Sequence, residues 1–576
     1  MGSDPAPTTA ATGQRPRVSA WAPLRHRVYR ILWLAQFVSN IGTFMQGVGA
    51  VWVMLELRQS PAVVALVQTA VALSVLLLGV PAGALADLID RRRLLLTTQG
   101  LMLAAAAALA VMTWAGTVTP ATLLGLTFAL GVGTALNAPA WQAVQPELVP
   151  AAEFPQAVTL GGASMNLGRA IGPALAGVII AATGPGLVFL LNALSFLAVI
   201  GALAAWRPKP EDRPGPPEQF DAAVRAGLRY AWHSHLIHYV LLRSGTFNLA
   251  SAGLLALLPV YATSQLDLGS GGLGLLYAAF GAGAAASALL LPRIRARIGV
   301  DGVVAAGTAA AAVMLLALAF TRSPAPAALI TFVAGAGWLA CLSVFNVAAQ
   351  QVLPDWVRAR GLALNLTVTA GATAVGSAAW GAVASELGVP GAFSWGSLAV
   401  ALTLLAGVRW RFSSIATYDL SPALLAAPDM PLAVPVGGPV FVTVTYQVQP
   451  GAEDDFQEAM QPLGWSRRRT GAVRWAVLQH AESPGQFVEI FVVASWAEYL
   501  RQQGRRTVAD AALDDRLRAF LRAGTEPEVE RFLTPSKPHH HDSDQRRVSP
   551  RRLHLNLPLQ TVPVPGGENP PGRSAT

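Results

Sequence analysis

The residues of this chain that could do chemistry are concentrated at the ends of long apolar stretches. Two carboxylates and three guanidinium groups stand close together in the run Asp87-Leu88-Ile89-Asp90-Arg91-Arg92-Arg93. A carboxylate at a helix end can bind a helix dipole or an Arg of a neighbouring segment, and such contacts hold segments together rather than transform a substrate. We therefore expect a contact between segments here, where a glycine lets two helices approach closely. Its expected members are Gly83, Asp87, Asp90, Arg91 and Arg92.

One further Arg, Arg169, lies inside an apolar stretch, residues 156–182. An Arg in hydrocarbon is costly and needs a partner, water, or a position near the membrane surface. The sequence does not distinguish between a structural ion pair and a functional role for Arg169. Carriers driven by protons need a titratable group in or near the pathway. No apolar stretch has a carboxylate at its middle; Glu56, Asp87, Glu147 and Asp355 lie at the ends of stretches, and Glu56 and Asp87 are the candidates for proton coupling if the chain is such a carrier.

Amide side chains inside the apolar stretches are the candidates for lining a binding cavity. An amide in lipid must find a hydrogen-bond partner, which a substrate or a neighbouring helix can supply. The residues are Gln36, Asn40, Gln46, Gln68, Asn137, Gln142, Asn248, Asn346 and Gln350. Hydrogen bonds between helices would account for part of this set without any substrate.

The composition argues against a series of soluble domains. The chain has 576 residues, of which 53% are hydrophobic and 13% charged, and its mean hydropathy is +0.46. Too few polar residues are present to cover several globular surfaces, so much of the chain must face lipid. The single cysteine, Cys341, excludes an internal disulfide framework and a zinc site of paired thiolates. No Walker-type phosphate loop is present, and we expect neither ATP as the direct energy source nor any metal or cofactor.

Twelve apolar stretches are long enough to cross roughly 30 Å of hydrocarbon. They are 28–57, 61–86, 94–115, 119–148, 156–182, 185–206, 237–263, 270–292, 301–321, 325–350, 361–385 and 389–409. They show no sustained alternation of polar and apolar residues, so we expect helices rather than the strands of a barrel. The first stretch is too long for a removable signal peptide. The predicted fold class is an all-α membrane protein with twelve transmembrane helices.

Arginine and lysine residues in the connecting loops fall almost wholly on one side of this bundle. The opposite loops contain only Arg58 and Arg322. By the positive-inside rule the arginine-rich side is cytoplasmic, and an even number of crossings puts both termini there. The net charge of +9 is then a topology signal that could also bind anionic lipid headgroups, and nucleic acid is not needed as a partner. We expect a multi-pass protein of the cytoplasmic membrane.

A sequence repeat divides the membrane part into two. Residues 137–149 return in similar form as 346–357, with amide side chains, a Pro and a carboxylate at the end of an apolar stretch in both copies. The copies occupy the same position in each set of six stretches. Two six-helix halves with a site between them are the architecture of a rocking transporter. The predicted parts are a polar segment 1–27, the halves 28–206 and 237–411, and a cytoplasmic linker 207–236.

Two motifs carry a resemblance to a known family. The loop 83–93 resembles the signature between the second and third helices of the major facilitator superfamily, although Leu88 stands where a basic residue is usual. Residues 166–177 resemble the Gly-Pro motif of its drug and metabolite exporters, and the gating set implied here is Gly168, Arg169, Gly172, Pro173 and Gly177. The sequences of residues 137–150, 168–177 and 354–361 are similar to those of the bacterial secretion-effector branch, which includes enterobactin-exporter-like proteins. This similarity covers residues 20–535.

This resemblance implies a secondary transporter that exports a small molecule by alternating access. The expected cargo is a siderophore, a drug or a secondary metabolite, and the expected mode is antiport driven by the proton gradient. The loop around Asp87 would hold the outward-facing state. One alternative is a transporter-enzyme hybrid whose C-terminal part modifies or senses the substrate, and another is a receptor or scaffold that transports nothing.

The character of the chain changes after Arg411. A Pro- and Ala-rich linker, 412–438, precedes a predicted strand at 440–448, a helix near 451–467, strands near 472–480 and 486–495, helices at 496–503 or beyond and near 509–523, and a last strand near 528–533. The order β-α-β-β-α-β predicts a small α+β ferredoxin-like cytoplasmic domain over 439–535. It resembles the dimeric α/β-barrel folds of small monooxygenases, so self-association, regulation and enzymatic activity are all open for it. Five side chains could line a pocket, but we favour a role in the core or in an interface for them: His480, Trp465, Trp475, Trp496 and Tyr499. The Pro-, Ser- and Arg-rich tail 536–576 is expected to be disordered.

Overall fold

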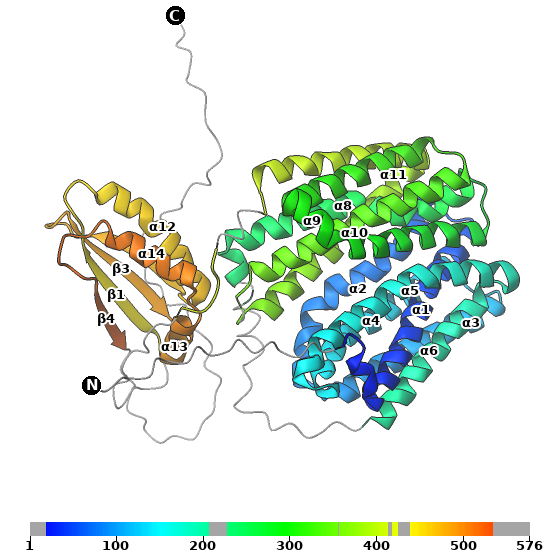
Figure 1. Ribbon diagram of the computed structural model, residues 1–576, viewed down its shortest axis with the longest axis horizontal. Helices are drawn as coiled ribbons and strands as arrows, with labels where there is room; N and C mark the ends of the chain where they lie inside the picture. Colours follow the sequence, from blue (N-terminus) through cyan, green and yellow to red (C-terminus); the bar gives the residue numbers. More distant parts are fainter. Residues whose placement is uncertain are drawn as a thin grey trace, which may run out of the picture. The chain divides into compact units, whose positions relative to one another are not determined.

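The computed structural model describes residues 19–206, 227, 229–354, 356–412, 418–423 and 438–533. Most of the predicted segments 1–27, 207–236 and 412–438, and all of the tail 536–576, lie outside the described residues. Figure 1 shows a large group of helices and a smaller part that contains a sheet. Ten of the described helices are long and apolar enough to cross a membrane, so the expectation of a mainly helical membrane protein is confirmed.

The first six helices begin where the sequence supplies start signals. Proline costs nothing in the first turn of a helix, where its missing N–H would have no partner, and α2, α4 and α6 each begin with it. Asp90 starts α3, because its carboxylate accepts a hydrogen bond from the backbone N–H of Arg93 at 2.8 Å. The bounds are α1 Arg27–Glu56, α2 Pro61–Leu88, α3 Arg91–Trp114, α4 Pro120–Leu148, α5 Phe154–Thr183 and α6 Pro185–Ala205.

Two of the four later membrane helices are about twice as long as a membrane crossing requires. The bounds are α8 His235–Ser264, α9 Ser270–Phe320, α10 Pro324–Gln351 and α11 Arg358–Arg409. At 1.5 Å per residue, the 51 residues of α9 would extend about 75 Å if the helix were straight. Gly299 interrupts α9 and Gly388 interrupts α11, at φ values of 71° and 72° that glycine adopts without steric cost.

Contacts on both sides of these glycines show that the chain folds back there. A Cβ at Gly283, before the interruption of α9, would meet the backbone of Phe332 on α10. A Cβ at Gly307, after the interruption, would meet Gly337 on the same helix. The two parts of α9 therefore both lie against α10. In α11 the parts before and after the interruption likewise both pack along α8.

The membrane helices form two groups that follow the order of the chain. In the first group α1 packs against α5 and α6, α3 packs against α4 and α6, and α2 packs against α4. In the second group α8 packs against α11, and α9 packs against α10 and α11. Figure 1 shows the first group in blue to cyan and the second in green to yellow-green. The two groups, called the first and second half below, meet mainly through α5 with α9 and α2 with α11.

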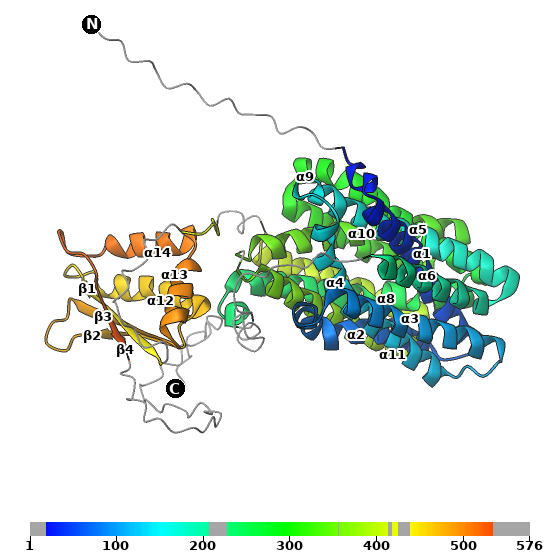
Figure 2. The ribbon, with the colours of Figure 1, turned by 90° about the horizontal axis from the view of Figure 1, so that it is seen from below.

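The C-terminal part is a four-stranded antiparallel sheet with its helices on one face. Its elements are β1 Val440–Gln447, α12 Glu453–Thr470, β2 Arg474–Gln479, β3 Gln486–Val493, α13 Trp496–Gly504, α14 Val508–Arg518 and β4 Glu528–Leu533. The strand order is β2-β3-β1-β4, and Val440 lies opposite both Val493 and Leu533. Alternate side chains of β1 point to the helices and join a core separate from that of the bundle. Figure 2 shows α12, α13 and α14 on the same side of the sheet, and α13 and α14 lie where the two helices at 496–503 and near 509–523 are predicted.

Candidate functional site

The first turn of α3, directly after the loop from α2, binds other helices of the first half. Arg91 forms an ion pair with Glu147 on α4. Arg92 donates hydrogen bonds of 2.9 and 2.8 Å to two carbonyl oxygens in the last turn of α6. All of these partners belong to the first half. The side chains of Gly83 and Asp87 lie outside the described residues, so the gating role of this loop stays a prediction.

Glycines of α5 set two different helix contacts. A Cβ at Gly172 would lie 2.8 Å from a backbone oxygen of α1, and a Cβ at Gly168 would lie 3.1 Å from the backbone of the same helix. A Cβ at Gly177 would instead lie 2.8 Å from a backbone oxygen of α9, and the carbonyl of Pro173 also approaches α9. Gly168 and Gly172 therefore set α5 against its own half, whereas Gly177 and Pro173 belong to the contact between halves.

The contacts between the halves extend from the arginine-poor helix ends to just past the middle of the bundle, where a Cβ at Gly79 on α2 would lie 3.0 Å from Thr367 Oγ1 on α11. The backbone N–H of Ala62 donates to Ser385 Oγ on α11 at 3.1 Å, and Thr69 Oγ1 donates to the carbonyl of Ala374 at 3.2 Å. Like the contact at Gly177, these bonds lie toward the helix ends that carry the arginine-poor loops. Helices α4 and α10, which end at the arginine-rich side of the bundle, pack mainly against helices of their own half.

Arg169 lies at the middle of the bundle, where helices of both halves meet. It stands fifteen residues after the first residue of α5 and fourteen before the last, so about 20 Å of helix separates it from either end. Its side chain cannot reach the membrane surface from this depth. The guanidinium carbon is 5.6 Å from the ring centroid of Phe44 on α1 and 5.4 Å from that of Trp338 on α10. Among the residues that the structure describes, Arg169 forms no ion pair and no hydrogen bond.

Five of the nine amide residues form hydrogen bonds within the bundle. The bonds are Gln36 Nε2 to Asn40 Oδ1 at 3.1 Å, Asn40 Nδ2 to Ser164 Oγ at 2.9 Å, Asn192 Nδ2 to Gln46 Oε1 at 3.2 Å, Gln99 Nε2 to Asn137 Oδ1 at 3.2 Å and Asn248 Nδ2 to the Ser244 carbonyl at 2.8 Å. The side chain of Gln68 is partly exposed, and those of Gln142, Asn346 and Gln350 are exposed. These four can be reached by a ligand.

Titratable groups near the helix ends bind their neighbours. Glu56, at the exposed end of α1, accepts a hydrogen bond of 2.7 Å from the indole N–H of Trp52. Arg243 is buried in α8, with Asp301 Oδ1 at 3.4 Å and the ring centroid of Phe412 at 4.2 Å, beside a cavity of about 380 Å³. The sequence reasoning missed this pair. Its signal is the same as that of Arg169, a lone Arg inside an apolar stretch.

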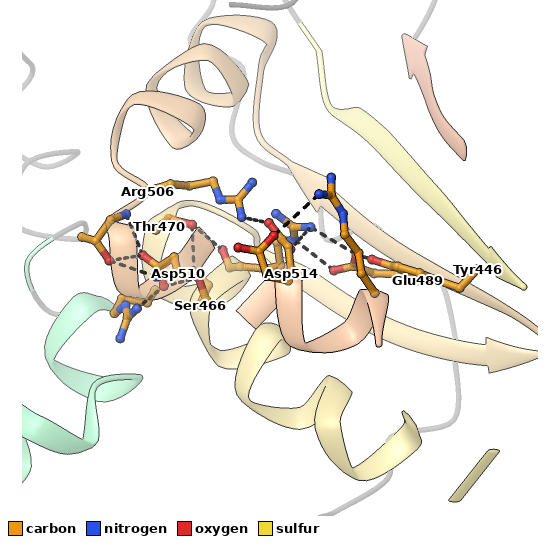
Figure 3. Close-up of polar contacts among 12 residues, drawn as sticks. Tyr446, Ser466, Thr470, Glu489, Arg506, Asp510 and Asp514 are labelled. Atoms are coloured by element: carbon orange, nitrogen blue, oxygen red, sulfur yellow. Dashed lines mark hydrogen bonds and ion pairs between the residues drawn. The ribbon is translucent and has the colours of Figure 1, made fainter. Parts of the chain in front are cut away.

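A buried charged network crosses the core of the C-terminal domain (Figure 3). Glu489 is fully buried and accepts hydrogen bonds from Arg467 Nε at 3.0 Å, Trp475 Nε1 at 2.9 Å and Tyr446 Oη at 3.0 Å. Burial alone would lower the pKa of Arg467, but Glu489 and Asp514 raise that pKa above its ordinary value. The carboxylate of Glu489 is thus held by groups of the domain itself, which gives it a structural role.

A second carboxylate of this domain, Asp510, joins two helices. It pairs with Arg469 and accepts a hydrogen bond of 2.6 Å from Ser466 Oγ, both on α12, while its reciprocal bonds with Thr507 cap α14. Burial raises the pKa of Asp510, but Arg469 and the hydrogen bonds outweigh burial and lower it below the ordinary value. Among the described residues, no group of three His, Cys, Asp or Glu side chains is placed to hold a metal ion.

The aromatic residues singled out in this domain serve its core more than a pocket. Trp496 and Tyr499 are buried with ring centroids 5.3 Å apart, and Trp475 is bound to the network described above. The side chain of His480 is exposed, and that of Trp465 is 36% exposed. Trp496, Tyr499 and Trp475 therefore belong to the hydrophobic core, which is the alternative that the sequence favours.

Comparison with known proteins identifies the family to which the chain is similar. A family model described as transmembrane secretion effector matches residues 18–539. A staphyloferrin A transporter of Staphylococcus aureus (strain NCTC 8325 / PS 47) is 32% identical over 168 residues, which are 29% of this chain and 42% of the relative. The enterobactin exporter EntS of Salmonella choleraesuis (strain SC-B67) is 30% identical over 277 residues, 46% of this chain and 63% of the relative. The chain thus matches less than two thirds of the length of either relative.

Solved transporter structures share the fold of the membrane part. A bacterial homologue of the human lysosomal transporter Spinster, in an inward-facing and unoccupied conformation, has a TM-score of 0.51 at 14% identity, over 69% of this chain and 98% of that one. The nucleoside transporter NupG has a TM-score of 0.54 at 11% identity, over 68% of this chain and 100% of that one. At these identities the likeness concerns the fold alone. The family model, however, covers most of the sequence, and this multi-pass membrane protein therefore belongs to the transmembrane secretion effector family within the major facilitator superfamily, as its motifs predict.

Proposed function

We propose that this protein is a secondary transporter that exports a small molecule across the cytoplasmic membrane by alternating access. The observation that carries the proposal is the uneven contact between the halves. They are joined through α2 with α11 and α5 with α9 from the arginine-poor side to about the middle of the bundle, whereas α4 and α10 pack mainly within their own halves. A site between two such halves is open toward one side only, which is the requirement of a rocking mechanism.

The proposed topology has twelve crossings in two sets of six. The reversals at Gly299 and Gly388 support it, because each divides a helix of about fifty residues into two parts of membrane length. The positive-inside rule places the arginine-rich loops, both termini and the ferredoxin-like C-terminal domain in the cytoplasm. The arrangement of the halves then corresponds to an inward-facing state. In this scheme the loop with Asp87 stabilises the opposite, outward-facing state.

The proposed cargo is a siderophore or a similar secondary metabolite. A staphyloferrin A transporter and an enterobactin exporter among the relatives support this class. The proposed energy source is the proton gradient, used in antiport, with Glu56 or Asp87 as the carboxylate that exchanges the proton. The cavity candidates that a ligand could reach are Gln68, Gln142, Asn346 and Gln350.

The test compares the small molecules retained by cells with and without the intact chain, before and after the proton gradient is collapsed. We expect at least one metabolite to accumulate in cells that lack the chain and to be released when the chain is restored. Release should stop when the gradient is collapsed. Equal accumulation in both strains would favour a receptor or scaffold and contradict the proposal. Release that continues without a gradient would contradict proton coupling alone.

For the C-terminal domain we propose self-association through the sheet face opposite its helices. The apolar side chains of this face are Ala476, Leu478, Val488, Ile490, Val492, Phe441 and Phe532. Phe532 is 51% exposed and Leu478 is 43% exposed. Arg474 lies at one edge of the face and Glu530 at the other, so a two-fold axis along the strands would bring opposite charges of two copies together.

The transporter-enzyme hybrid lacks a comparable observation, because the buried charged groups of the domain bind one another. Deletion of residues 436–576 separates the two ideas. A carrier whose tail only associates should keep export of the unmodified cargo if the shortened chain still inserts. A hybrid should lose the modified product in the medium while the precursor accumulates in the cell. Insertion is checked by the yield of the shortened chain in membranes.

A further inference from the structure

We propose that Arg169 is the anion-binding residue of the transport site, and that the cargo is an organic anion with a carboxylate beside an apolar or aromatic body. The inference rests on the proposed function, because it names the substrate class of that exporter. It is carried by the depth of this Arg, by the lack of a counter-charge from the described chain, and by the two rings beside its guanidinium group.

Among the described residues, the charge of Arg169 has no carboxylate partner. The helices that bring it together with the two rings, α1, α5 and α10, contain a single carboxylate, that of Glu56. Glu56 stands twelve residues beyond Phe44 on α1, about 18 Å along the helix. A guanidinium group at the centre of a membrane protein without an anion or water is strongly unfavourable. An anion that enters the site from outside the chain supplies the missing charge.

The rings restrict what that anion can be. Phe44 and Trp338 lie within the range at which an aromatic ring attracts the guanidinium group, at 5.6 and 5.4 Å. They leave its five N–H donors without a hydrogen-bond acceptor from the described residues. A carboxylate matches these donors with two parallel hydrogen bonds. Aromatic walls favour an apolar body next to it, so an organic acid fits the site better than inorganic phosphate or chloride.

The site is accessible and has polar groups nearby. The side chains of Arg169, Phe44 and Trp338 are each partly exposed, so a ligand can contact all three. Within about two turns toward the arginine-rich side, Gln36, Asn40 and Ser164 form a chain of hydrogen bonds. Within the described structure the Oε1 atom of Gln36 is buried without a hydrogen-bond partner. This atom can accept a hydrogen bond from a hydroxyl or amide of the same cargo.

The position of Arg169 also connects binding to the movement of the halves. A Cβ at Gly281 on α9 would lie 2.7 Å from the carbonyl oxygen of Arg169, so its backbone belongs to the contact between α5 and α9. One of its rings, Phe44, comes from the first half and the other, Trp338, comes from the second. A relative rotation of the halves must change the distance between these rings. The geometry of the anion site is therefore different in the two states of the cycle.

The test measures binding of 1-naphthoate and of its neutral counterpart 1-naphthamide to the full-length protein in lipid nanodiscs. Empty nanodiscs give the background. The variants are R169Q, which removes the charge, and R169K, which keeps the charge without the planar fork. Arg27→Gln is the matched control, because Arg27 is exposed at the start of α1. Size-exclusion profiles and melting temperatures establish that each variant is folded.

We expect the wild-type protein to bind naphthoate above background. R169Q should weaken this binding at least tenfold, R169K severalfold, and Arg27→Gln by less than twofold, while naphthamide binding stays the same in all four proteins. Equal naphthoate binding by wild type and R169Q would overturn the proposal, and so would the absence of naphthoate binding by wild type. If R169Q does not fold, Trp338→Leu is measured in its place. An unchanged naphthoate affinity in that variant would also overturn the proposal.

The result of this binding assay depends neither on a proton gradient nor on the direction in which the protein transports its cargo. A protein that binds naphthoate through Arg169 but releases no metabolite from cells would keep the anion site and overturn the proposed export. A protein that exports a metabolite but binds naphthoate independently of Arg169 would keep the export and overturn the anion site. The two proposals can therefore fail separately.

Discussion

At the scale of single residues, the buried arginines of this protein differ in whether the chain supplies an anion. Arg243 has Asp301, Arg467 has Glu489, and the half-buried Arg91 has Glu147. These carboxylates offset the cost of taking a guanidinium group out of water. Arg169 has two rings instead, one from each half. A ring attracts the cation but leaves its donors unused, which is the reason why this residue is assigned to the cargo.

The sequence could indicate which charged residues matter but not what they contact. A lone Arg in an apolar stretch is visible at once, and so is the charged run that begins at Asp87. The partner of Arg91 is 56 residues away in the sequence, and that of Arg243 is 58 residues away. A local sequence pattern cannot predict a contact between residues so far apart in the chain. For Arg169 the relevant neighbours come from three helices, so only the packed bundle identifies them.

Asp510 provides a prediction about acid stability in the isolated domain, residues 438–533, which has a hydrophobic core of its own. Its pKa in the folded state is lowered, although burial opposes this, by Arg469 and by hydrogen bonds. Its contribution to stability is therefore present above the unfolded pKa of about 3.9 and is lost as the pH falls through the folded pKa. We expect Asp510→Asn to cost about 2 kcal/mol at pH 7. Urea unfolding at a series of pH values measures this.

The same titration contains the control for that prediction. In the Asp510→Asn variant, the free energy of unfolding should fall less steeply below pH 4 than it does in the wild-type domain, because the variant has no carboxylate to protonate at this position. Other acidic residues contribute equally to both proteins, so the difference isolates Asp510. Parallel pH curves for the two proteins would show that Asp510 is not the residue responsible.

At the scale of elements, the sequence predicts most of the helices and strands but not how tightly they approach one another. The strand predicted over 528–533 has these bounds in the structure, and the breaks between apolar stretches coincide with Gly299 and Gly388. Apolar periodicity and turn residues are local signals, which explains this agreement. The small residues of α5 are equally visible, but the sequence does not show that Gly177 contacts α9 whereas Gly172 contacts α1.

Gly177 allows a prediction about the contact between the halves. A Cβ at this position would lie 2.8 Å from a backbone oxygen of α9, closer than such atoms approach without a shift. We expect Gly177→Ala to force α5 and α9 apart at a cost of about 1–3 kcal/mol, and to reduce the export rate more than fivefold. Gly162→Ala on the same helix is the control, because nothing lies within 4 Å of a Cβ there. Equal export by the two variants would contradict this role of Gly177.

The open face of the sheet leads to a prediction about self-association. Ile490 lies near the centre of this face, between Ala476 on β2 and Thr443 on β1. A charge there would be buried between two stacked sheets, so we expect Ile490→Glu to weaken association of the domain at least tenfold. Light scattering over a range of concentrations measures this effect. Ala512→Glu adds the same charge at an exposed position of α14 and should leave the mass unchanged. A wild-type domain that is monomeric at all concentrations would contradict the proposal.

At the scale of the whole molecule, sequence and structure answer different parts of the question. The repeat of residues 137–149 in 346–357 and the one-sided arginines are patterns of the chain, and they predict two halves and an orientation. Which side of the bundle is closed depends on how the halves rotate relative to each other. The same sequence must populate both states in a transport cycle, so no sequence pattern can select one. The contacts of α2 with α11 and of α5 with α9 supply that information.

These contacts allow the cycle to be stopped in one state. Ala62 and Ser385 belong to different halves, and their backbone N–H and side-chain oxygen are 3.1 Å apart. In the double variant Ala62→Cys and Ser385→Cys, oxidation or a short thiol cross-linker should join α2 to α11 and hold the arginine-poor side closed. Since the native Cys341 is buried, it should not compete. We expect cross-linking to abolish export, and reduction of a disulfide to restore it, because the halves can then separate again. Each single variant should export under the same oxidising conditions, and a cross-linked protein that still exports would show that these halves do not rock about this contact.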